Sequence, residues 1–148
     1  MSNIQYHHLR VGAEPPNLGN MRSFAAVVII EDEVDWKWRD KISRWLVDSG
    51  CLFMMAWGRD CKLWDESVDY ANIDDFPDGE IPEDRLVLTT WHDDEPLEEL
   101  FWFAQHSAHH EGIEQKRLLL LDISQMPRKD AVMQQLVRSY DLDLRESD

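Results

Sequence analysis

The stretch FAAVVIIEDEVDWKWRDKISRWLVDSGCLFMMAWG, residues 24–58, decides the fold. It contains two apolar runs, residues 24–30 and 51–57, that are rich in β-branched or large side chains typical of strands. Uninterrupted apolar strands are typical of a parallel sheet that is covered on both faces. Between the runs, apolar residues recur at helical spacing, namely Val34, Trp38, Ile42, Trp45 and Leu46. The stretch therefore predicts a strand–helix–strand unit with a right-handed crossover.

The same alternation of apolar runs and amphipathic segments continues along the chain. It predicts strands at residues 85–90 and 117–123, and helices at residues 61–71, 95–111 and 129–140. Asp60 is the candidate cap of the first of these helices, and Asp93 or Asp94 is that of the second. Strands and helices that alternate in this way form a mostly parallel sheet with helices against it. The predicted fold is an α/β, three-layer, Rossmann-like sandwich with a mostly parallel four-stranded sheet and helices on both faces.

The segments on either side of this pattern differ from it in composition. Residues 1–22 predict a loop-rich N-terminal arm, in which the sequence YHHLR is compatible with an additional edge strand. Residues 23–141 are expected to form a single α/β domain, since their number is ordinary for one domain. Residues 142–148 are expected to form a flexible acidic tail.

The charge of the chain restricts its partners. Thirty acidic residues against fifteen basic ones give a formal net charge of −15. A nucleic-acid binder needs basic side chains to neutralise phosphates, and the same repulsion applies to anionic membranes. We therefore expect neither nucleic acid nor membrane as a partner. An acidic surface favours solubility or the attraction of a basic protein.

The two cysteines and the N-terminus indicate a cytoplasmic protein. Cys51 and Cys61 frame a predicted strand that spans about 20 Å, beyond the reach of a disulfide. They are therefore expected to be reduced thiols, as in the cytosol. Cys61 begins a predicted helix, where the pKa of a thiol can fall. No signal sequence or membrane-spanning run is evident in the chain.

Acidic residues gather where the predicted strands end. Ligands of such folds bind beyond the carboxyl ends of the strands, and Glu31, Asp93 and Asp122 come from three different strands. One hypothesis is that these three carboxylates bind Mg²⁺, since this ion prefers oxygen ligands. Glu31, His92 and Asp93 would then be the catalytic residues, with His92 assisting proton transfer. The other hypothesis is that the acids cap helices and offset helix dipoles.

Two family resemblances concern the same residues. The sequences VVIIEDE and LLLLDISQMP resemble the first strand and the phosphoacceptor strand of receiver domains, although Asp32 and Asp122 lie about twice too far apart in the chain. Glu31 and Asp93-Asp94-Glu95 resemble the acidic motifs of the Toprim fold of primases and topoisomerases. The glycine usual after that glutamate is absent, and Asp-Asp-Glu departs from Asp-x-Asp. The second resemblance implies a divalent-metal-dependent hydrolase or phosphotransfer enzyme.

Two tryptophans fall off the predicted core stripes of their helices. Trp36 shares its helical face with polar residues, and Trp102 shares its face with His106 and His109. Exposed tryptophan is typical of binding surfaces, so these four residues are a candidate partner-binding set. The alternative is that a wide core stripe or the N-terminal arm covers both indoles. The histidines are three apart, as in some zinc sites, but the ligand motif is incomplete.

The leading hypothesis is a non-enzymatic, acidic protein-interaction module. It would bind a basic protein partner or a second copy of itself, and a bacterial immunity or antitoxin-like protein is one concrete form. No glycine-rich phosphate-binding loop or nucleophile elbow is evident, so no cofactor is expected. The alternative hypothesis is the Mg²⁺-dependent hydrolase or phosphotransfer enzyme with a Toprim-like acidic edge.

Overall fold

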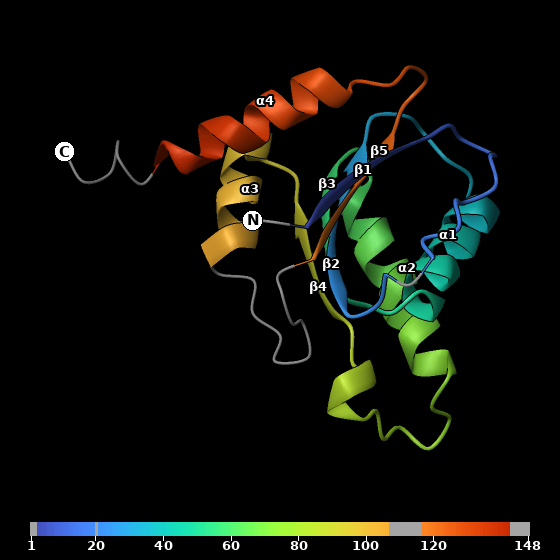
Figure 1. The fold of residues 1–148 in the computed structure, drawn as a ribbon. Coiled ribbons are helices and arrows are strands. Elements are labelled where there is room, and N and C mark those ends of the chain that lie inside the picture. The colour runs from blue at the N-terminus through green and yellow to red at the C-terminus, as the bar shows by residue number, and fades with distance from the viewer. Residues whose placement is uncertain (1–2, 20, 107–116, 143–148) are drawn as a thin grey trace.

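In the part of the chain that the structure describes, five parallel strands form one sheet at the centre of the molecule (Figure 1). The computed structural model describes residues 3–19, 21–106 and 117–142. The sheet order is β1-β5-β2-β3-β4, and every neighbouring pair is parallel. The strands are β1 (Ile4–Leu9), β2 (Phe24–Ile30), β3 (Cys51–Gly58), β4 (Leu88–His92) and β5 (Leu118–Ile123). The predicted parallel α/β architecture is confirmed.

The predicted number of four strands is wrong, because the N-terminal arm contributes β1. This strand pairs with β5, with Tyr6 opposite Leu120 and His8 opposite Asp122. Its sequence IQYHHL lacks a continuous apolar run because the strand lies at the sheet edge and is only partly buried. An edge strand with one half-exposed face carries a weak sequence signal, so only YHHLR indicated its presence.

Among the described residues, four α-helices cover the sheet, two on each face (Figure 1). Helices α1 (Trp36–Asp48) and α2 (Cys61–Asp74) lie on one face, and α3 (Leu97–His106) and α4 (Lys129–Tyr140) lie on the other. A short 3₁₀ helix, η1 (Glu83–Arg85), precedes β4. The chain moves outward from β2 to β4 across one face and returns across the other to β5. The fold is therefore a doubly wound, Rossmann-like α/β sandwich.

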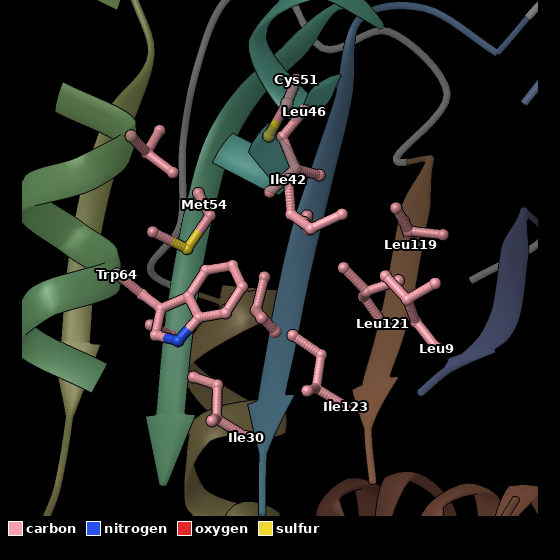
Figure 2. Close-up of a cluster of buried hydrophobic side chains, with 14 of the residues drawn as sticks. Leu9, Ile30, Ile42, Leu46, Cys51, Met54, Trp64, Leu119, Leu121 and Ile123 are labelled. Carbon is pink, nitrogen blue, oxygen red and sulfur yellow. The ribbon is translucent and has the colours of Figure 1, made fainter. Parts of the chain in front are cut away.

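The alternation of side chains along the strands divides the core into two layers. Val28, Met54 and Leu121 belong to the layer that faces α1 and α2, together with the fully buried Trp64. Figure 2 shows Trp64 beside Met54, and Leu121 farther along the same layer. Val27 and Met55 face α3 and α4. Since β2, β3 and β5 are buried on both faces, they need apolar residues at almost every position, and their sequences have them except at Asp122 of β5 and the terminal Gly58 of β3.

Several predicted boundaries and caps require correction. The third predicted strand, residues 85–90, is displaced to Leu88–His92, because Arg85 belongs to η1. Asp60 precedes α2 but has a φ of 54° and makes no side-chain capping bond. The predicted continuation of the third helix beyond His106 and most of the predicted tail lie outside the described residues. Within those residues, no helix has both the length and the apolar character needed to cross a bilayer.

Candidate functional site

The carboxyl ends of β2 and β5 carry an ionic network at the point where the chain reverses direction across the sheet. After β2 the chain passes to α1 on one face, and after β5 it passes to α4 on the other, so this is the topological switch point. Asp122, on β5, has no exposed surface. Arg128, which precedes α4, donates from Nη2 to Asp122 Oδ1 at 2.6 Å. The guanidinium thus supplies the charge that this buried carboxylate requires.

The same guanidinium also contacts the acid that follows β2. Arg128 Nη1 lies 2.5 Å from Glu31 Oε1, and the Glu31 side chain is half-exposed. Tyr6, from β1, donates its hydroxyl proton to Asp122 Oδ2 at 2.5 Å and accepts the backbone N–H of Arg128 at 2.9 Å. One network therefore connects β1, β2, β5 and the start of α4.

The pKa values of this network follow from burial and pairing. Burial acts to raise the pKa of Asp122, but hydrogen bonds from Arg128 and Tyr6, together with the guanidinium charge, outweigh it and hold that pKa below its ordinary value. Burial and the bond to Asp122 raise the pKa of Tyr6 to about 12. Asp122 is therefore ionised and Tyr6 is a neutral donor at neutral pH.

The structure brings two of the three candidate metal ligands together, but around a side chain of the protein. Glu31 and Asp122 both contact Arg128, which stands where the hypothesis had placed a cation. Asp93 follows β4, which two strands separate from the Asp122 strand. Within the part of the chain that the structure describes, no three His, Cys, Asp or Glu side chains are grouped as metal ligands. The residues present do not fit the predicted Mg²⁺ site.

His92 belongs to a separate hydrogen-bonded series at the end of β4. Its Nε2 lies 2.8 Å from the Thr90 hydroxyl, and its Nδ1 contacts the Glu95 carboxylate. The Trp57 indole donates to the backbone oxygen of Glu95 at 2.7 Å and so fixes the turn that leads to α3. A hydroxyl, an imidazole and a carboxylate in series can transfer a proton, but acyl transfer also needs oxyanion donors and a substrate pocket.

Helix capping accounts for fewer of the acidic residues at the strand ends than the capping hypothesis predicts. Asp35 caps α1, because its carboxylate accepts the backbone N–H of Trp38 at 2.9 Å. Helix α3 begins at Leu97, and the backbone N–H groups of Glu99 and Leu100 donate to the oxygen of Pro96, so neither Asp93 nor Asp94 occupies its cap position. Asp93 and Asp94 are exposed in the turn after β4.

Both cysteines are free and buried. Burial is the main cause that raises the pKa of Cys61, and the nearby Asp93 charge raises it further. The expectation of a lowered pKa at a helix start is therefore wrong. Burial also raises the pKa of Cys51 to about 12, so neither thiol is an activated nucleophile.

Among the candidate partner-binding residues that the structure describes, Trp36 and His106 are exposed, and Trp36 is the large apolar one. Its surface is 60% exposed at the first residue of α1. Trp102 is partly buried on α3, where its ring stacks on His106 with centroids 4.6 Å apart. Trp36 belongs to α1 and Trp102 to α3, and these helices lie on opposite faces of the sheet. His109 lies outside the described residues.

Sequence reasoning missed Arg128, Tyr6 and the exposure of Trp91. The acid within the apolar run LLLLDI was an available signal, because a charge buried in a strand needs a cationic partner. Trp91, which directly follows the predicted strand of residues 85–90, is 43% exposed, because β4 forms the edge of the sheet. Its position at the end of a predicted strand did not reveal which strand would be outermost.

Fold and network together define a doubly wound α/β domain with an acid–arginine network at its switch point. The chain belongs to the family described as a domain of unknown function, DUF7684, whose model matches residues 4–139. The match begins with β1 and ends one residue before the end of α4, so it includes the whole sheet. No curated protein and no solved structure matches the chain.

Proposed function

We propose that the chain is an acidic protein-interaction module that binds a basic protein partner through the Trp36 surface, defined as residues 31–36. The exposure of Trp36 is the observation that carries this proposal. A tryptophan that is 60% exposed contributes little to the core, whereas the same side chain is among the most frequent hot spots of protein interfaces.

The charges beside Trp36 support a basic partner. Glu31, Glu33 and Asp35 are all exposed in the segment that leads into α1. The Nζ of Lys37 lies over the indole ring, 5.7 Å from its centroid, so a cation already contacts this ring in the free protein. A lysine or arginine of a partner would gain the attraction of the ring and of the carboxylates.

The geometry of the strand ends supports this function over the Mg²⁺-dependent enzyme. A metal ion at Glu31 and Asp122 would have to displace Arg128, whose bonds to Asp122 are buried. Removing one partner of a buried ion pair commonly costs about 3–5 kcal/mol, which metal binding would have to offset. The two free thiols favour a reducing compartment such as the cytoplasm. A bacterial immunity or antitoxin-like role remains one form of the proposal.

Site-specific photo-crosslinking in the native host tests the proposal. A photoreactive phenylalanine analogue at position 36 should crosslink one discrete protein of high isoelectric point, which mass spectrometry would identify. The same analogue at Val137, which is 59% exposed on α4, is the matched control and should not crosslink it. Equal capture at both positions, or capture of acidic proteins alone, would contradict the proposal.

A further inference from the structure

We infer that β4 is the self-association edge of the protein, where it pairs antiparallel with β4 of a second copy about a two-fold axis at Thr90. Two five-stranded sheets would then join into one continuous sheet. This inference is independent of the proposed function, because it uses a different surface and a different occupant.

The first argument is the unpaired edge of β4. Among the described residues, β4 has β3 as its sole strand neighbour. Its sequence, LTTWH, contains no lysine, proline or acid, which are the usual residues that protect an edge from another strand. Leu88 is 37% exposed and Trp91 is 43% exposed. The edge therefore offers unprotected backbone groups and apolar side chains.

The second argument is the charge of the strand relative to the chain. Acids make up 30 of 148 residues, yet β4 has none. Two copies that each carry a net charge of −15 repel one another, so they associate most readily at a surface where few acids face one another. Beside β4, Asp69 of α2 accepts the Thr89 hydroxyl at 2.8 Å, and Lys62 of the same helix lies over the Trp91 ring, 5.8 Å from its centroid. This condition favours a second copy at β4 over contacts through the acid-rich segments of the chain.

The third argument selects the antiparallel direction. Asp93 and Asp94 follow β4 directly. In a parallel pair these acids would meet those of the second copy at strand spacing, about 5 Å. In an antiparallel pair centred on Thr90, the two Asp93 residues lie at opposite ends, about 20 Å apart at the rise of a strand. That separation exceeds the Debye length of about 8 Å at physiological salt.

The antiparallel register is also self-complementary in its side chains. Thr90 lies opposite its own copy, Trp91 lies opposite Thr89, and His92 lies opposite Leu88. Thr89 and Trp91 share the sheet face of α1 and α2, since they are opposite Met54 and Ala56 of β3. A two-fold axis perpendicular to the sheet keeps them on the same face, so each indole packs on a threonine, a favourable cross-strand pair.

Disulfide trapping of the full chain tests both the contact and its register. In Thr90→Cys the two cysteines would lie directly opposite, within about 5.5 Å between Cα atoms, which is within disulfide range. Mild oxidation should convert most of this variant to a dimer of twice the 17.5 kDa chain mass. Thr89→Cys is the matched control and should stay monomeric, because its two sulfurs face tryptophans. The natural cysteines are buried and give no background.

Substitutions of opposite charge at Thr90, the residue on the proposed two-fold axis, provide a second test. Thr90→Glu and Thr90→Lys should each sediment as monomers, and their mixture should form a heterodimer. Circular dichroism would confirm that both variants are folded. The wild-type dimer should strengthen as salt rises, because salt screens the repulsion between two acidic copies. A wild type that stays monomeric in high salt, or equal trapping of both cysteine variants, would overturn the inference.

Binding of a basic partner at the Trp36 surface has the opposite salt dependence to the dimer, so either proposal can be contradicted without the other. Association with a basic partner weakens as salt rises, whereas the dimer strengthens. Loss of the dimer with retention of partner binding would therefore count against the β4 pairing alone.

Discussion

Arg128 neutralises Asp122, a carboxylate with no exposed surface, through a bond of 2.6 Å across the loop between β5 and α4. The guanidinium is itself partly exposed and extends to Glu31 at the end of β2. A buried ion is costly unless it is paired and hydrogen-bonded, and here three donor groups of Arg128 and Tyr6 satisfy one carboxylate. The switch point, where this fold usually binds ligands, is thereby closed by an internal ion pair.

Arg128→Met is expected to destabilise the protein severely. The variant leaves Asp122 buried without a cation, so the free energy of unfolding should fall by about 3–5 kcal/mol. Urea unfolding followed by tryptophan fluorescence measures this change. Lys41→Met is the control, because its ion pair with Glu14 is exposed at the surface and should contribute under about 1 kcal/mol. Equal losses for both variants would refute the role given to Arg128.

The stability of the protein should fall in acid through Asp122. Its pKa is lowered in the folded state, so its contribution is fully present above its ordinary value of 3.8 and is lost as pH falls through the folded value. In Asp122→Asn this part of the pH dependence should disappear. The measurement is the urea midpoint of each protein between neutral pH and acid. Asp130→Asn, an exposed change in the first turn of α4, should keep the wild-type slope.

Gly58→Ala should disrupt the turn between β3 and α2. Gly58 has a φ of +103°, and a Cβ there would lie 2.4 Å from the backbone oxygen of Ile30. Both the backbone strain and the clash oppose folding, with an expected loss of more than about 2 kcal/mol in thermal or urea unfolding. Gly79→Ala is the control, because its φ is +81° but nothing lies within 4 Å. If the two variants lose equal stability, the close approach to Ile30 is not the cause.

Trp36→Ala should leave the fold intact. Exposed side chains away from caps and networks change stability by about 0.5 kcal/mol or less. Trp64→Ala should instead cost about 3–5 kcal/mol, because that indole is fully buried beneath α2. Thermal unfolding of both variants gives the comparison. A large loss in Trp36→Ala would mean that the indole is structural, which would remove the main support for the Trp36 surface.

The sequence predicted those elements whose burial produces a regular pattern. Residues 24–30 and 129–140 were predicted with the bounds that the structure has, because β2 is apolar throughout and α4 repeats at helical spacing. The edge strands were harder to predict from the sequence. β1 has no continuous apolar run, and β4 was displaced because η1 occupies Arg85. Edge strands mix apolar and polar residues, so their limits depend on tertiary contacts.

The candidate site was predictable in part for a comparable reason. Parallel strands place their carboxyl ends together, so the proximity of Glu31 and Asp122 followed from the fold class. The identity of the cation between them did not follow from the fold class. Arg128 comes after a proline in an irregular loop, and the path of such a loop has no periodic signal in the sequence. The position of Trp36 off the core stripe left two alternatives open, and the structure shows the exposed one. The partial burial of Trp102 depended on how α3 packs, which periodicity alone does not show.

The affinity of the crosslinked partner for the wild type and for Trp36→Ala, measured by calorimetry at low and high salt, tests the central claim most directly. The Trp36 surface predicts that Trp36→Ala loses about 2 kcal/mol or more, roughly thirtyfold in affinity, and that wild-type binding weakens as salt rises. Val137→Ala, a change at an exposed residue of α4, should bind like the wild type. Equal affinity of the wild type and Trp36→Ala at both salt concentrations would contradict the account.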